Sequence, residues 1–69
     1  MVEVFKTSVP DRKTADSILG ELLDLIPSAQ INFDLEDCDN ILRIDSRNNA
    51  AEVVISHLNR LGFDCEELE

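Results

Sequence analysis

The chain has 69 residues, with fifteen acidic and six basic side chains and a formal net charge of -9. A chain this short buries only about 60% of its unfolded surface, so we predict one domain over residues 1–69. The charge excludes a nucleic-acid partner and an anionic membrane, both of which require a basic surface. Because no apolar run is long enough to span a bilayer and no signal segment precedes the domain, we expect a cytoplasmic protein.

The first half of the chain predicts a strand, a helix and a second strand. Residues 2–9 are rich in β-forming Val and Phe and stop at a proline. Asp11 is a typical helix-capping residue, and Pro27 ends the helix that follows it. The apolar side chains of this helix fall on one face: Ala15, Ile18, Leu19, Leu22, Leu25 and Ile26. In residues 30–37 apolar and polar side chains alternate, which predicts a strand with one buried face.

The second half predicts a hairpin partner, a second helix and a last strand. After a tight acidic turn at residues 38–40, ILRID alternates in the same way and pairs with the preceding strand. Ser46, Asn48 and Asn49 are expected to cap a helix that ends at Gly62. Its buried face is formed by Ala51, Val54, Ile55, Leu58 and Leu61. The sequence FDCEEL then predicts a short strand.

The order βαββαβ predicts an α+β ferredoxin-like sandwich, in which two helices cover one face of a four-stranded antiparallel sheet. In that topology residues 10–14, 37–40 and 62–63 meet at one end of the molecule. The two edge strands carry carboxylates that disfavour edge pairing, and this favours a monomer.

Several segments resemble the heavy-metal-associated domains of copper chaperones and metal-pumping ATPases. VISHLNRLGFDC resembles the closing segment of that family, in which an amphipathic helix runs into Gly-Phe or Gly-Tyr and then a small apolar residue. Thr7-Ser8-Val9, the helix anchored by Ile18 and Leu22, and the strands INFDLED and ILRID follow in the order that the family uses. The resemblance spans nearly the whole chain and implies a single heavy-metal-associated-like domain.

In that family the loop after the first strand carries Met-Thr-Cys-x-x-Cys, whose two thiolates hold one soft cation. The matching stretch here is VPDRKT, with Asp11 and Thr14 where the cysteines would stand. Neither is a soft ligand, and Arg12 and Lys13 between them oppose a cation. The resemblance therefore implies a relative without the thiolate pair, with no metal and no cofactor. We expect the loop to be a capped helix start.

Four charged residues are candidates for contact with a partner: Arg12, Lys13, Asp34 and Glu36. Arg12 and Lys13 are also placed to form ion pairs with Asp37 and Asp39 across the shared end of the fold.

The acidic turn DLEDCD offers an alternative metal site that uses Cys38 with Asp37 and Asp39. The stretch lacks the spacing of a calcium-binding loop, and runs of charge are usually solvated surfaces. The expected reading is therefore a solvated acidic hairpin, with the metal site kept as an alternative.

The remaining reactive side chains predict no catalytic site. Cys65 shares a strand face with Phe63, which predicts a thiol in the core. His57 lies at the margin of the second helix's apolar face and is expected to be a surface or boundary residue. No local Ser/His/Asp or Cys/His pattern accompanies them, so we expect no enzyme.

Three functions remain open at this stage. The first is a non-catalytic module that docks on a basic protein partner through its acidic sheet face or hairpin. The second is a metal-handling protein that uses Cys38 with carboxylates or pairs Cys38 across a dimer. The third is a small-ligand regulatory domain similar to ACT domains, although the glycine-bearing loop of that class is missing here. An RNA-recognition motif would expose aromatic side chains, and this chain has only three phenylalanines.

Overall fold

The six elements follow one another in the predicted order in a computed structural model of the chain, which describes residues 1–36 and 38–68. They are β1 (Val2–Thr7), α1 (Arg12–Leu25), β2 (Gln30–Asp34), β3 (Ile41–Asp45), α2 (Ala51–Arg60) and β4 (Cys65–Leu68). Within the described residues, no helix is both long and apolar enough to cross a membrane.

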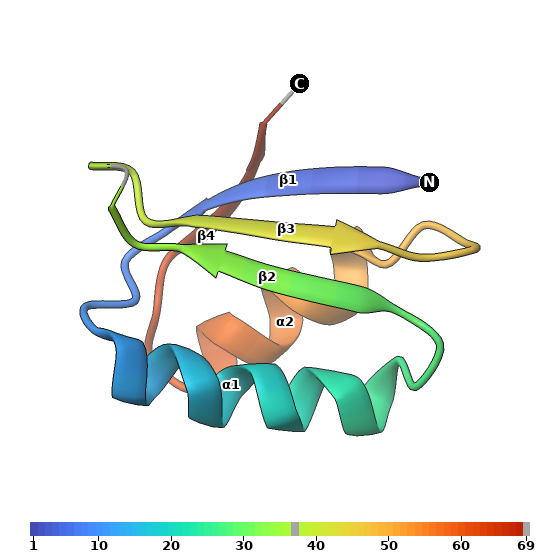
Figure 1. Cartoon of the computed structure of the whole chain (residues 1–69), viewed down its shortest axis with the longest axis horizontal. Helices are drawn as coiled ribbons and strands as arrows, with labels where there is room; N and C mark the ends of the chain where they lie inside the picture. Colours follow the sequence, from blue (N-terminus) through green and yellow to red (C-terminus); the bar gives the residue numbers. More distant parts are fainter. Residues whose placement is uncertain (37, 69) are drawn as a thin grey trace.

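The four strands form one antiparallel sheet in the order β2-β3-β1-β4. β3 lies between the two strands that α1 connects, and β1 lies between the two that α2 connects, so each crossover leaves room for one strand from the other half. Both helices cover the same face of the sheet (Figure 1). The predicted α+β ferredoxin-like fold is confirmed.

The core lies between the helix layer and this covered face. Its centre consists of side chains with no exposed surface: Phe5, Val9, Ala15, Leu22, Leu42, Ile44, Val54 and Leu58. The prediction that Leu25 and Leu61 belong to the core is wrong, because Leu25 is 54% exposed and Leu61 is 42% exposed. Each follows a buried leucine by three positions, which turns it about 60° away from the centre of the buried stripe.

Three strands are shorter than predicted, because β4 starts at Cys65 instead of Phe63 and two other strands end early. β1 ends at Thr7, where the backbone N–H of Val9 donates back to the Thr7 hydroxyl over 3.3 Å and turns the chain out of the sheet. β2 ends at Asp34, whose carboxylate accepts a hydrogen bond from the backbone N–H of Glu36 over 3.2 Å. The hairpin connection therefore spans residues 35–40 and is longer than the expected tight turn.

The start of α2 differs from the prediction. Ala50 occupies the N-cap position and contributes no side-chain hydrogen bond. Ser46 donates to the carbonyl of Asn48 over 2.6 Å, while Asn49 accepts from the first N–H of the helix over 2.9 Å. The N–H of Ala50 is instead satisfied by the carboxylate of Glu3, 2.8 Å away on β1. Of the three expected capping residues, only Asn49 therefore bonds to the first N–H of α2. The other capping bond comes from Glu3, which is distant in the sequence.

Candidate functional site

The predicted meeting of three loops at one end of the molecule is confirmed by hydrogen bonds to the end of β1. The backbone N–H of Thr7 donates to the carbonyl of Asp39 over 3.2 Å, and the Thr7 hydroxyl donates to the carbonyl of Asn40 over 2.7 Å. The side-chain amide of Asn40 donates to the carbonyl of Val9 over 2.7 Å. Asp37, which belongs to the same predicted cluster, lies outside the described residues.

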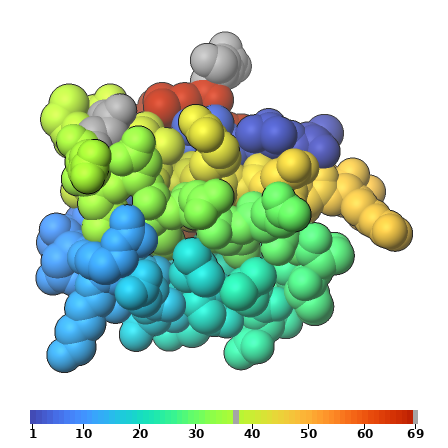
Figure 2. Space-filling model, in the orientation of Figure 1, coloured from blue at the N-terminus to red at the C-terminus, as the bar shows by residue number. Residues whose placement is uncertain are grey.

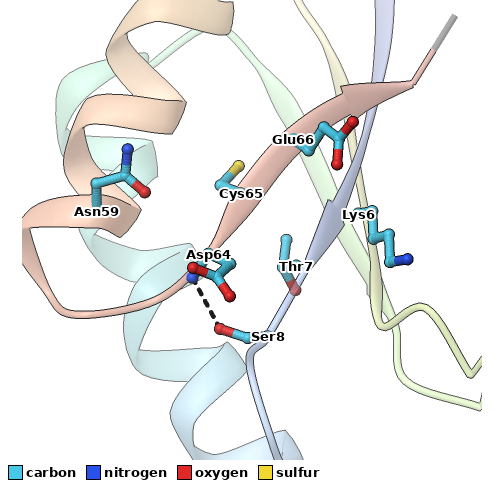
Figure 3. Close-up of a pocket in the computed structure, with 7 residues that line it drawn as sticks. All are labelled: Lys6, Thr7, Ser8, Asn59, Asp64, Cys65 and Glu66. Carbon is cyan, nitrogen blue, oxygen red and sulfur yellow. Dashed lines mark hydrogen bonds between the residues drawn. The ribbon is translucent and has the colours of Figure 1, made fainter.

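The turn from α2 into β4 reaches the same end. Gly62 has a φ of 94°, in the left-handed region that favours glycine, and so closes the helix as predicted. The N–H of Ser8 donates to the carbonyl of Asp64 over 3.1 Å, and the N–H of Asp64 donates to the Ser8 hydroxyl over 2.8 Å (Figure 3). These paired bonds hold the β4 turn against the end of β1.

The loop VPDRKT acts as the predicted capped helix start. The Asp11 carboxylate accepts a 2.8 Å hydrogen bond from the backbone N–H of Thr14. This bond, together with the Thr14 hydroxyl and the charge of Lys13, lowers the pKa of Asp11 below its usual value. The two positions that would carry thiolates in a heavy-metal-associated domain are therefore engaged in capping.

Arg12 pairs with Asp16 and not with Asp39, so that expected ion pair is wrong. The expected pair with Asp37 stays a prediction, because Asp37 lies outside the described residues. The Arg12 guanidinium donates to the carbonyl of Phe33 over 3.0 Å and lies 3.6 Å from Asp16, one turn further along α1. The first turn of the helix directs the side chain towards the edge of β2, where it lines a shallow depression with Leu35 and Glu36. Among described residues Lys13 forms no ion pair, and the cation 3.6 Å from Asp39 is Lys6.

The alternative metal site receives no support from the part of the hairpin that the structure describes. Cys38 is exposed, and Asp39 is already in contact with Lys6. Within residues 1–36 and 38–68, no group of three or more His, Cys, Asp or Glu side chains is arranged to hold a metal ion. Because Asp37 lies outside these ranges, the proposed set of ligands stays a prediction.

A depression of about 420 Å³ lies between β4, the end of β1 and the end of α2 (Figure 3). It is lined by Lys6, Thr7, Ser8, Asn59, Asp64, Cys65 and Glu66. The Cys65 thiol is partly buried and packs against the core, close to its predicted position. Burial raises the pKa of Cys65 to about 11, so the thiol is protonated at neutral pH and is a poor nucleophile.

His57 has a partner that the sequence alone did not indicate. Its Nε2 lies 2.7 Å from Oε1 of Glu21, and the histidine side chain is only 16% exposed. Glu21 comes from α1, so the pair joins the two helices. The boundary position of His57 is confirmed, while its carboxylate was missed because it lies far away in the sequence.

The two faces of β1 are arranged in an unexpected way. The face towards the helices carries Glu3, Phe5 and Thr7, all buried, while Val2 and Val4 lie on the opposite face. One oxygen of Glu3 caps α2, and the other is buried without a hydrogen-bond partner in the described structure. The sequence signal for the burial of Glu3 is its position two residues before Phe5, because residues two apart on a strand share a face.

No described helix packs on the face of the sheet opposite α1 and α2 (Figure 1), and in Figure 2 the strands lie above α1 with no helix over them. The pairing register places Val4 between Arg43 of β3 and Leu68 of β4, and places Lys6 between Ile41 and Glu66. Val2 is 59% and Leu68 39% exposed. We call this surface, formed by the outward residues of the four strands, the open sheet face.

The open sheet face has a basic centre and an acidic margin. Arg43 makes no hydrogen bond or ion pair with another described residue, and its lateral neighbours in the sheet are Asn32 and Val4. Carboxylates lie along its margin, with Asp34 and Glu66 on the two edge strands and Asp45 at the end of the inner strand β3. The arrangement suits contact with another macromolecule better than chemistry on a small molecule, since it is flat and combines apolar and charged side chains.

Comparison with known proteins gives no relative. No family model, no curated protein and no solved structure matches the chain. The resemblance to heavy-metal-associated domains therefore stays a prediction from sequence.

Proposed function

We propose that the chain is a non-catalytic protein-interaction module of the cytoplasm, similar in topology to heavy-metal-associated domains but without their thiolate pair. Its docking surface is the open sheet face, and its partner carries basic groups around the contact.

The observation that carries the proposal is which side chains of β1 point away from the helices. This central strand turns a carboxylate into the protein and leaves Val2 and Val4 outside, where Leu68 extends the apolar surface. Phe5 fixes this orientation of β1, because its side chain is fully buried and a shift of the strand pairing by one residue would expose it. Contiguous apolar side chains on an uncovered face are typical of interaction sites, whereas isolated ones are common on any surface.

The charge of the protein supports a basic partner. The net charge of -9 attracts a cationic surface at long range and speeds encounter with it. The acidic margin of the open sheet face lies where the rim of an interface would form, and rim charges mainly affect the rate of association.

Selection of random peptides displayed on phage against the folded protein tests the proposal. We expect binders rich in apolar and basic residues, and we expect their affinity to fall at least about tenfold in the double variant Val2→Thr/Val4→Thr. Threonine keeps the β-branched shape of valine and its preference for strands. Val53→Thr is the matched control, because Val53 is 45% exposed on α2, in the layer that covers the other face.

Two results would overturn the proposal. One is a selection without binders, or with binders that tolerate the double threonine variant as well as Val53→Thr. The other is stoichiometric binding of Cu(I) by the reduced protein against a competing chelator, with loss of that binding in Cys38→Ser. The second result would make the chain a metal carrier.

A further inference from the structure

We infer that the partner of the open sheet face places a carboxylate side chain on Arg43, within a frame of apolar side chains, and that the partner is a different protein. This inference rests on the proposed function and specifies the chemistry of the contact.

The position of Arg43 imposes this requirement. In the sheet it is next to Val4, and on its own strand it is two residues from Ile41, so any partner that covers these apolar side chains also removes water from the guanidinium. A desolvated charge without a counter-ion weakens binding strongly. Asp34 and Glu36 line the same depression as Arg43, but neither forms an ion pair with it, and Arg43 has no ion pair with any other described residue. The partner must therefore supply the anion, and a carboxylate matches the planar guanidinium with two parallel hydrogen bonds.

Lys6, the other cation on this face, does not need an anion from the partner. Lys6 lies 3.6 Å from Asp39, and the strand register places it opposite Glu66 of β4. Its charge is balanced from within the chain, whereas that of Arg43 is not. The anion of the partner is thus directed to one position near the middle of the face.

A second copy of this chain does not provide the matching surface in an aligned packing of two sheets. With a twofold axis parallel to the strands, the register places Asp34 of one copy opposite Glu66 of the other. With the axis perpendicular to the strands, Arg43 faces Arg43 of the other copy. Both arrangements bring like charges together, and the net charge of -9 on each copy adds to the repulsion.

A partner surface with a central carboxylate and basic groups at its margin satisfies both parts of the face. The carboxylate meets Arg43, and the basic groups meet Asp34, Asp45 and Glu66 along the margin. This pattern of alternating sign discriminates against a uniformly basic surface, which would repel Arg43 at the centre of the contact.

A charge exchange tests the inference with the peptides selected for the wild-type chain. We expect each tight binder to contain one Asp or Glu flanked by apolar residues. Arg43→Glu should weaken these peptides at least about tenfold, and the same peptides with that acid replaced by Lys should regain affinity for Arg43→Glu. Arg60→Glu is the control, because it changes the net charge equally on an exposed residue of α2 that has no ion pair among the described residues.

The outcomes separate the inference from the proposed function. If peptides bind and are lost in Val2→Thr/Val4→Thr but respond equally to Arg43→Glu and Arg60→Glu, the inference fails and the docking surface stands. The inference also fails if the selected peptides carry no acid, or if sedimentation shows a dimer that Val4→Thr dissociates. If no peptide binds, or binding is independent of the open sheet face, the proposed function itself fails.

Discussion

Replacing Asn40 by alanine and by glycine separates two contributions to the stability of the hairpin end. Asn40 has a φ of 48°, a left-handed conformation that costs most residues about 1 kcal/mol or more and glycine almost nothing. Its amide also donates a 2.7 Å hydrogen bond to the carbonyl of Val9, a contact that contributes about 1 kcal/mol on average. Asparagine tolerates the left-handed region better than alanine does. We expect Asn40→Ala to lower the free energy of unfolding by about 2 kcal/mol and Asn40→Gly by about 1 kcal/mol.

Urea unfolding followed by circular dichroism measures the difference. With a slope of about 1 kcal/mol per molar urea for a domain of this size, the midpoints of the two variants should lie about 1 M apart, with glycine the more stable. An alanine variant as stable as the glycine variant would refute the role of the left-handed backbone. If neither variant differs from the wild type, the amide hydrogen bond contributes nothing, and the account of this end of the molecule is wrong.

Three further predictions concern single positions. Gly20→Ala should stabilise the chain by about 0.5–1 kcal/mol, because a Cβ at this exposed helix position meets nothing within 4 Å. Gly62→Ala should destabilise the chain by about 1 kcal/mol or more, because its φ is 94°. Thermal melts would show shifts of the melting temperature of opposite sign. Thr7→Val should lower the free energy of unfolding by about 1–3 kcal/mol despite the strand preference of valine, since the buried hydroxyl makes two hydrogen bonds. Thr7→Ser keeps the hydroxyl, so the amide of Val9 that donates to it should stay protected in hydrogen exchange. The lowered pKa of Asp11 means that its capping bond stabilises the fold above its ordinary pKa of 3.8 and that this contribution is lost as the pH falls through the lowered value. Asp11→Asn retains an acceptor for Thr14, so its stability should be flatter over this acidic range in urea titrations at several pH values; an unchanged pH profile would contradict this role of Asp11.

The features of the fold that depend on local sequence were predictable. The cap at Asp11, the stop at Pro27 and the closing glycine at position 62 act through their immediate neighbours, and all three appear in the structure. The alternating strand at residues 30–34 was also predicted, because a period of two residues reports directly which face is buried.

Contacts between distant segments were predicted less well. The carboxylate at the start of α2 comes from Glu3, and nothing near Ala50 in the sequence indicates it. Arg12 was expected to pair with Asp39, but its guanidinium donates to the carbonyl of Phe33 and pairs with Asp16. The loops of the candidate site were placed correctly by topology, whereas their side-chain partners depended on packing that topology does not specify.

The position of β1 in the sheet also affects the order in which the fold can form. β1 is synthesised before either of its neighbours, and its second neighbour, β4, begins only at Cys65. A nascent chain can pair β1 with β3 once Asp45 has been made, but the other edge of this central strand stays unpaired until β4 has been made. Formation of the sheet requires contacts between distant parts of the sequence, which slows folding in comparison with helical bundles of similar size. During that interval, the unpaired edge of β1 is open to other nascent chains, and the surrounding carboxylates provide repulsion that limits such pairing.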